Sequence, residues 1–163
     1  MDVPIAEIEV ERRVAAFVEA LRADGQRVTR QRLEVAREIA RTSTHPDVET
    51  VYENVRARIP TISLDTVYRT LATLERRGFV RRMEAVTGPT RYDPNLERHD
   101  HFICTNCGLI RDIYGNYQEC VRVPESVPDV GRVESVTVQL RGLCSQCQGP
   151  PASEAESEKG VGE

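Results

Sequence analysis

The chain has 163 residues, of which 39% are hydrophobic and 29% are charged, and its formal net charge is −4. This length and composition predict a globular protein of one ordinary domain or two small ones. No apolar run approaches the roughly 20 residues that span a bilayer, and no basic-then-apolar signal pattern opens the chain. The sequence therefore argues against a membrane-spanning protein, and we expect a cytoplasmic one.

The charges are unevenly distributed along the chain. Residues 1–92 carry 16 Arg and 14 acidic residues, whereas residues 93–163 carry 6 basic and 12 acidic residues. Every basic residue except Lys159 is Arg, the better ligand for phosphates and base edges. This asymmetry indicates that the first half contacts nucleic acid and the second half does not.

Three helices are expected in the first third of the chain. Apolar residues at helical spacing predict a first helix over residues 5–23, ended by Gly25. Thr29 is a suitable N-cap for a second helix, and Asp47 is one for a third helix that Pro60 would close.

A fourth helix has the clearest pattern. Ser63 is a good N-cap, and Gly78 occupies the position where helices end in a left-handed residue. The apolar stripe between them consists of Leu64, Val67, Leu71 and Leu74. Phe79–Met83 and Thr90–Asp93 then predict a two-stranded hairpin that turns at residues 87–89. Helices followed by such a hairpin are typical of the winged helix, a helix-turn-helix variant.

The second half is expected to consist mainly of strands. These strands are predicted at His101–Cys104, Leu109–Tyr114 and Val133–Arg141. Alternation in the last strand should place Val136, Val138 and Leu140 on its inner face. A short helix is expected at Asn116–Arg122, and the Gly, Pro, Ser and Glu content from Gly149 onward predicts a disordered tail.

The cysteines indicate a structural metal site. Four of the five form two C-x-x-C pairs, Cys104 with Cys107 and Cys144 with Cys147. Four thiolates favour tetrahedral zinc and leave no open position for chemistry, so the metal should tie strands of one sheet together. The alternative is a redox dithiol, which two pairs in one small region make much less plausible. Cys120 lies outside the pattern and is expected to be a small buried hydrophobe.

The three histidines suggest a second site. One residue separates His99 from His101, and this spacing places both imidazoles on one face of a strand. Asp93 lies just upstream and Asp112 lies on the next predicted strand, so the group suits Fe(II), Mn(II) or Zn(II). The alternative is surface histidines in a polar linker, with His45 an ordinary loop histidine.

Several spaced motifs resemble one known family over roughly residues 10–148. They are His45-Pro46, Ile62–Leu71, Arg91–Asp93, His99–Gly108 and Gly142–Cys147. In this order they resemble the Fur family of metalloregulators. The resemblance implies an α+β protein with an N-terminal winged helix-turn-helix domain and a C-terminal α/β dimerisation domain. The corresponding boundaries are 1–92 for the DNA-binding domain, 93–98 for the hinge, 99–148 for the zinc-stapled dimerisation and sensing domain, and 149–163 for the tail.

The resemblance also implies partners and ligands. The protein would be a homodimer that represses transcription from a pseudo-palindromic operator in double-stranded DNA. Its regulatory metal, Fe(II) or Mn(II), would be held by His45, Asp93, His99, His101 and Asp112, and its structural Zn(II) by the four paired cysteines. A third metal site of some members is not expected, because Val133–Arg141 contains no histidine.

Within the family the chain most resembles the peroxide-sensing PerR type, in which the last carboxylate is Asp, as at Asp112. In that type, Fe(II) reacts with hydrogen peroxide and a histidine ligand is oxidised; the matching positions are His45 and His99. This step has no turnover, so the protein is not expected to be an enzyme. The alternative in the family is a repressor that senses iron, zinc or manganese levels. A thiol-disulfide or metal-dependent enzyme is a remote alternative, because no nucleophile–base motif is present.

The predicted DNA contacts lie on the fourth helix and among the arginines. Tyr68 and Arg69 are the candidates for base contacts, since Tyr can meet a thymine methyl and Arg can pair with guanine. The alternative for Tyr68 is packing beside the apolar stripe. The remaining expected contacts are Ser63, Thr66 and Thr70, together with Arg27, Arg30, Arg32, Arg81 and Arg82 on phosphates.

Overall fold

The computed structural model describes residues 5–83, 88–115, 131–132 and 136–149. The chain divides into two compact units, Met1–His99 and Asp100–Glu163. Each unit has its own set of elements, and each is described separately below.

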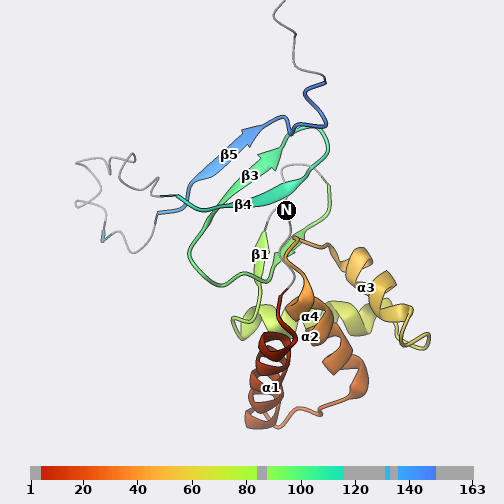
Figure 1. Ribbon diagram of the computed structural model, residues 1–163. Helices are drawn as coiled ribbons and strands as arrows, with labels where there is room; N and C mark the ends of the chain where they lie inside the picture. Colours follow the sequence, from red (N-terminus) through yellow and green to blue (C-terminus); the bar gives the residue numbers. More distant parts are fainter. Residues whose placement is uncertain (1–4, 84–87, 116–130, 133–135, 150–163) are drawn as a thin grey trace, which may run out of the picture. The chain divides into compact units, whose positions relative to one another are not determined.

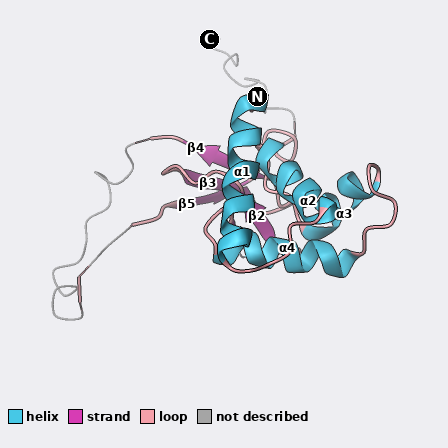
Figure 2. Cartoon of the chain, turned by 90° about the horizontal axis from the view of Figure 1, so that it is seen from below, coloured by secondary structure: helices cyan, strands magenta, loops and turns pink. Residues whose placement is uncertain are grey.

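The first unit contains four helices. They are α1 (Glu7–Ala23), α2 (Arg30–Arg41), α3 (Val48–Arg56) and α4 (Leu64–Arg76). Helix α2 packs against the other three, and α3 packs against α4 (Figure 2). Their buried faces form a main core whose fully enclosed residues include Phe17, Val35, Val51, Val67 and Leu71, and a smaller cluster of Val10, Val14 and Ala40.

The predicted helix starts are confirmed by their caps. The side chain of Thr29 accepts from the Arg32 N–H, and that of Ser63 accepts from the Thr66 N–H. Each cap satisfies a backbone donor that the first helical turn leaves without a partner. The predicted end of α3 at Pro60 is wrong, because the helix ends at Arg56.

Two short strands complete the first unit. Strand β1 (Arg81–Met83) pairs antiparallel with β2 (Arg91–Asp93), with Arg81 opposite Asp93. Gly78, at φ 71°, ends α4 in the left-handed region and turns the chain toward β1. Helices followed by this hairpin form the predicted winged helix, although Thr87 of the expected turn lies outside the described residues.

The second unit contains a three-stranded sheet in the part of it that is described. Strand β3 (Asp100–Cys104) lies between β4 (Ile110–Ile113) and β5 (Gln139–Gly142), antiparallel to β4 and parallel to β5 (Figure 1). The parallel pairing brings two segments far apart in sequence side by side, so the ends of β3 and β5 meet.

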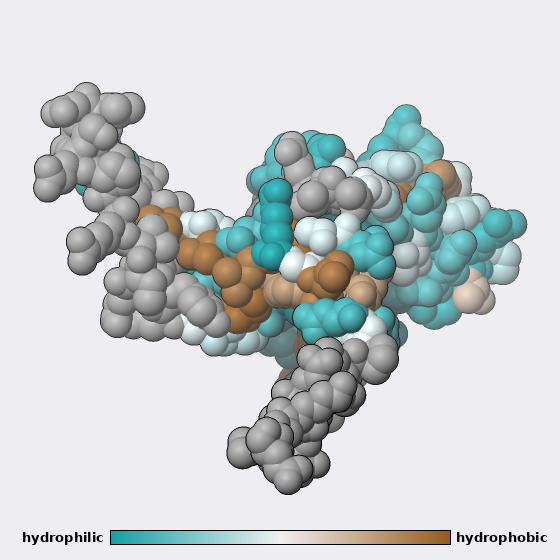
Figure 3. Space-filling view, turned by 90° about the horizontal axis from the view of Figure 1, so that it is seen from above, coloured by the Kyte–Doolittle hydropathy of each residue, from teal (hydrophilic) through white to brown (hydrophobic). Residues whose placement is uncertain are grey.

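The last strand differs from its prediction. Among the described residues of Val133–Arg141, the strand begins only at Gln139, and Leu140 is 40% exposed instead of facing inward. Strand β5 is an edge strand of the described sheet, and the side chain of Leu143 just after it is exposed as well. In Figure 3, hydrophobic surface is drawn in brown. The predicted helix Asn116–Arg122, with Cys120, lies outside the described residues, as do residues 133–135 and 150–163. No described helix is long and apolar enough to cross a membrane.

Candidate metal centres and nucleic-acid interface

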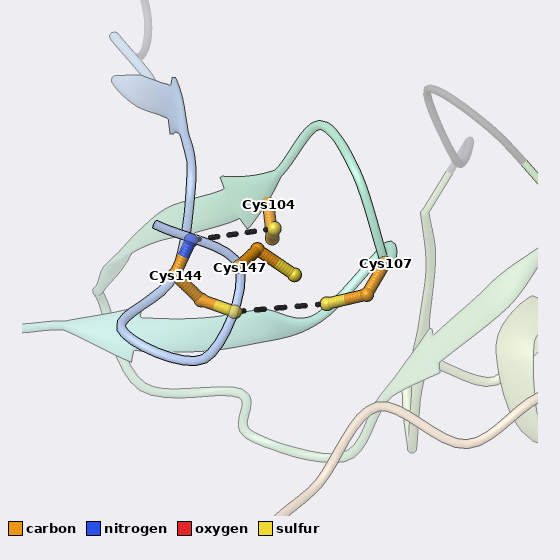
Figure 4. Close-up of side chains that lie close together, drawn as sticks. All are labelled: Cys104, Cys107, Cys144 and Cys147. Carbon is orange, nitrogen blue, oxygen red and sulfur yellow. Dashed lines mark hydrogen bonds between the residues drawn. The ribbon is translucent and has the colours of Figure 1, made fainter. Parts of the chain in front are cut away.

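The four paired cysteines come together at one end of the sheet (Figure 4). Cys104 ends β3 and Cys107 lies in the turn that follows it, while Cys144 and Cys147 lie in the turn after β5. Their sulfur atoms all lie within 4.8 Å of one another, and none of the four forms a disulfide. The parallel pairing of β3 with β5 causes this meeting, because it sets Cys104 opposite Gly142, two residues before Cys144.

Backbone and side-chain donors surround these sulfur atoms. The Cys144 N–H lies 3.3 Å from the Cys104 sulfur, and the Asn106 side-chain amide lies 3.3 Å from the Cys147 sulfur. Hydrogen bonds from the Cys107 and Cys144 amides lower the pKa of Cys104 to about 6. The Asn106 hydrogen bond acts to lower the pKa of Cys147, but the crowding thiols of Cys144 and Cys107 raise it to about 11. A bound cation would stabilise the four sulfurs together as thiolates.

This donor set fits a structural metal ion. Four sulfurs within mutual reach provide a closed tetrahedral shell, which zinc prefers and which leaves no position for a substrate. The amide donors match the hydrogen bonds by which surrounding groups orient the ligands of a metal ion. We therefore regard the cysteine group as a candidate structural centre.

A second group of possible ligands lies in the first unit. His45 precedes α3, Asp93 ends β2, and His99 closes the segment after β2. Nε2 of His45 lies 3.7 Å from Oδ1 of Asp93, and Nε2 of His99 lies 3.3 Å from Oδ2 of Asp93. All three residues are buried. The alternative of surface histidines in a polar linker is therefore wrong for His99 and, in the second unit, for His101, while His45 lies in a loop as that alternative held but is buried.

The loop that carries His45 is fixed to β2 by its next two residues. The Tyr92 N–H donates to the Pro46 carbonyl at 2.9 Å, and Nη1 of Arg91 lies 3.3 Å from Oδ2 of Asp47. Strand β2 therefore supplies Asp93 and, through the two residues before it, also positions the loop of His45.

The segment between Asp93 and His99 orients both of these side chains. Oδ1 of Asp93 accepts from the Asn95 N–H at 2.8 Å, and Oδ1 of Asn95 accepts from the Glu97 N–H at 3.2 Å. Nδ1 of His99 lies 2.9 Å from the Glu97 carbonyl oxygen. Because a carbonyl only accepts, Nδ1 carries a proton and donates it, and Nε2 is the nitrogen turned toward Asp93. A metal-binding histidine is oriented in the same way by a carbonyl behind it.

In the second unit, His101 and Asp112 occupy opposite positions of β3 and β4. Nε2 of His101 lies 3.9 Å from Oδ1 of Asp112, and neither side chain is exposed. The expected ligands thus fall into a group of three in the first unit and a pair in the second. Imidazole and carboxylate donors together fit a divalent ion of intermediate softness such as Fe(II), Mn(II) or Zn(II).

Helix α4 presents a polar face opposite its buried stripe. Tyr68 is 49% exposed, so the alternative of core packing does not apply to it, and Arg69 is exposed beside Asp65. A groove of about 510 Å³ runs between the start of α4 and the start of α2. Its lining includes four of the predicted contacts, namely Arg27, Arg32, Thr66 and Arg69.

Two predicted DNA contacts are placed differently. Thr70 is only 1% exposed and its hydroxyl donates to the Thr66 carbonyl at 2.7 Å, so a DNA contact by Thr70 is wrong. The physical reason is that this short side chain lies next to the stripe and bonds to its own helix. Arg81 donates to the carbonyls of Leu96 and Glu97. Ser63 is an N-cap, while Arg30 and Arg82 are exposed.

Sequence reasoning missed the residues that position these side chains. Asn95 could have been found, because Asn and Asp at turns bond to the backbone two residues on. Asp47 was identified only as a cap. No sequence signal points to the hydrogen bonds of Arg81, because their acceptors are backbone carbonyls 15 and 16 positions away.

Comparisons with known proteins agree with this architecture. The profile of the Ferric uptake regulator family matches residues 23–140. The peroxide-responsive repressor PerR of Staphylococcus aureus is 31% identical over 149 residues, which are 91% of this chain and 99% of that protein. The ferric uptake regulator Fur of Helicobacter pylori, described as having three functional metal binding sites, has a TM-score of 0.76 at 27% identity, over 88% of this chain and 96% of that one. The Campylobacter jejuni peroxide stress regulator has a TM-score of 0.57 at 31% identity, over 72% and 88%.

A winged helix and a small β unit, with two groups of side chains that could hold a metal ion, are the features of a metal-dependent transcriptional regulator. The chain belongs to the Ferric uptake regulator family. Members of this family are DNA-binding regulators and not enzymes, so the enzyme alternative is dropped.

Proposed function

We propose that this protein is a metal-dependent repressor that senses hydrogen peroxide. The observation that carries the proposal is the buried group of His45, Asp93 and His99, in which His99 is oriented by a carbonyl behind it. His101 follows two residues later and faces Asp112 across the sheet. We assign all five side chains to one regulatory Fe(II) or Mn(II), and the four cysteines to a structural Zn(II).

The switch then follows from where the ligands lie in the chain. Three of them belong to the winged-helix unit and two to the sheet unit. Ligation by both groups at once favours one arrangement of the two units, by the difference in metal affinity between that arrangement and others. In a homodimer, this would set two α4 helices about 34 Å apart, as a pseudo-palindromic operator requires. We take residues 1–92 as the DNA-binding domain, 93–98 as the hinge and 99–148 as the dimerisation and sensing domain.

Peroxide sensing is supported by the ligand set and by the named relatives. A bound Fe(II) would promote transfer of one oxygen atom from hydrogen peroxide to a histidine ring; the ring would be oxidised by two electrons, and the other peroxide oxygen would leave as water. His45 and His99 are the expected targets, because they match the positions of the oxidised histidines in the PerR type; Nε2 of each ring lies near Asp93. Oxidation of either ring would remove one ligand of the regulatory metal. The metal would then no longer join β2 to the loop of His45 or to the end of the hinge, and operator binding would weaken. The relatives named for peroxide sensing share 31% identity with this chain.

The second candidate is a repressor that responds to the level of iron, zinc or manganese. It is favoured by the higher TM-score with the Helicobacter pylori iron regulator and by a TM-score of 0.62, at 27% identity, with a zinc-bound manganese uptake regulator.

Mass spectrometry separates these two functions. Protein loaded with Fe(II) is treated with hydrogen peroxide, digested, and compared with Mn(II)-loaded protein as the control. We expect a gain of one oxygen on the peptide that contains His45 or His99, only with Fe(II), together with loss of operator binding. No gain with binding retained contradicts peroxide sensing and leaves metal-level sensing. The variant Asp112→Glu should still bind the metal but lose much of the peroxide response.

The dimer and the DNA contacts are also proposals. Leu140 on the edge strand β5 and Leu143 just after it are exposed, and they support a homodimer formed through the sheet unit, because exposed hydrophobic surface often marks a partner interface. For DNA, we assign base contacts to Tyr68 and Arg69.

A further inference from the structure

Arg81 is the first residue of the wing, the hairpin of β1 and β2. Its side chain contacts the segment that follows β2. Its Nη2 donates to the Leu96 carbonyl at 2.7 Å and its Nη1 donates to the Glu97 carbonyl at 3.4 Å. In the β1–β2 pairing, the same residue stands opposite Asp93. Arg81 is therefore fixed to both ends of this segment, through its backbone at Asp93 and through its side chain at residues 96 and 97.

The Glu97 carbonyl is an acceptor that two side chains share. It receives the Nδ1 proton of His99 at 2.9 Å as well as Nη1 of Arg81. A carbonyl has two lone pairs and can accept both donors at once. The carbonyl that orients the His99 ring is thus itself oriented by a guanidinium from the wing, and Nε2 of His99 faces Asp93 as a result.

The neighbouring arginine has a different environment. Side chains alternate between the two faces of a strand, so Arg82 points away from the side on which Arg81 lies. Arg82 lines a separate groove with Tyr68 and Tyr92, on the polar face of α4. Both arginines are exposed, but Arg81 contacts the hinge segment and Arg82 lines the surface assigned to DNA.

We propose that Arg81 is a positioning residue for the regulatory metal site and not a phosphate contact. It keeps the Glu97 carbonyl in place, and this carbonyl orients the ring of His99. The wing therefore fixes the orientation of a metal ligand. The inference rests on the proposed function for the role of His99, and it replaces the DNA contact expected for Arg81. Removal of a group that orients a ligand lowers metal affinity by about 10–100-fold.

The test compares Arg81→Met with Arg82→Met in the full-length, zinc-loaded protein. Mn(II) affinity is measured by electron paramagnetic resonance, and operator binding of Mn(II)-saturated protein is measured at several salt concentrations. We expect Arg81→Met to weaken Mn(II) binding by about ten-fold or more and to leave the salt slope unchanged. Arg82→Met should leave Mn(II) affinity unchanged and reduce the slope by about one, as expected for a lost phosphate contact. Unchanged Mn(II) affinity in Arg81→Met, or a reduced salt slope, overturns the proposal.

A readout without Mn(II) separates this inference from the proposed function. Amide hydrogen exchange at Asn95 and Glu97 should be faster in Arg81→Met than in wild type or Arg82→Met, and Arg81→Lys should restore part of the protection. Equal exchange rates in all four proteins overturn the positioning role. If His99→Ala does not alter Mn(II) binding, the assigned metal site fails, whereas the exchange result still decides what Arg81 does. If Arg81→Met does not fold, Arg81→Gln, which also removes the charge, replaces it in all measurements, and Arg81→Lys stays the rescue variant.

Discussion

Asp47 shows how one side chain can serve two elements. Its Oδ1 accepts the Thr50 N–H at 2.7 Å and so caps α3, while its Oδ2 lies 3.3 Å from Nη1 of Arg91 on β2. Burial acts to raise the pKa of Asp47, but the hydrogen bonds from Thr50 and the charge of Arg91 outweigh it, so the pKa is lowered. The residue therefore fixes the start of α3 to the strand that carries Asp93, next to the loop of His45.

These two roles of Asp47 can be separated by substitution. Asp47→Asn retains a good N-cap but removes the charge, so it should lower the free energy of unfolding by less than about 1 kcal/mol, as for a partly exposed ion pair. Asp47→Ala removes both the cap and the ion pair. Loss of the cap should lower the free energy of unfolding by a further ~0.5–2 kcal/mol beyond the effect of Asp47→Asn. Urea unfolding followed by circular dichroism measures both values. Equal losses in the two variants would show that the cap contributes nothing.

At the scale of an element, one side of α4 packs in the core and the other side is available for recognition. Val67 and Leu71 have no exposed surface, whereas Tyr68 and Arg69 are exposed on the other side of the same helix. A helical repeat of 3.6 residues makes this possible, since neighbours in sequence point in different directions. Packing and recognition can therefore be altered independently on this helix.

Paired alanine substitutions on α4 test this division. Leu71→Ala should lower the free energy of unfolding by about 2–5 kcal/mol, because it leaves a cavity in the core. Tyr68→Ala should change it by less than about 0.5 kcal/mol, as at other surface sites, and instead weaken operator binding. Thermal unfolding and fluorescence anisotropy with operator DNA are measured on both. Strong destabilisation by Tyr68→Ala would place its ring in the core and contradict the DNA assignment.

At the scale of the whole molecule, the two metal groups have different positions in the chain. The four paired cysteines belong to the sheet unit, whereas the helices have their own core in the first unit. Loss of a structural zinc should therefore affect the two units unequally, because a small metal-tied unit derives much of its folding free energy from the metal.

Removal of zinc from the intact protein tests this expectation. Chelation, or the substitution Cys144→Ser, should abolish the zinc content and the order of β3, β4 and β5, while the helical circular dichroism signal largely remains. His45→Ala is the matched control and should keep its zinc. If the helical signal is lost in parallel with zinc, the two units do not fold independently.

Several features of the fold and site could be predicted from particular residues. Thr29, Asp47 and Ser63 marked three helix starts, since caps depend on chemistry within one turn. The C-x-x-C spacing predicted the meeting of four sulfurs, because each pair reaches one metal locally. Leu140 was misassigned, since alternation identifies the two faces of a strand but not whether another element covers the apolar one. Thr70 was misassigned because a hydroxyl can bond to its own helix and be buried.

The sequence by itself determined the local elements, the two groups of donor residues and the division of charge between the halves, because caps, periodicity and short spacings act within a few residues. Tertiary structure alone decided which distant groups meet. The parallel pairing of β3 with β5 joins the two cysteine pairs, and β2 brings Asp93 against His45. It also decided that Arg81 binds backbone carbonyls of the segment before His99. Backbone acceptors are identical at every residue, so no pattern in the sequence could have identified them.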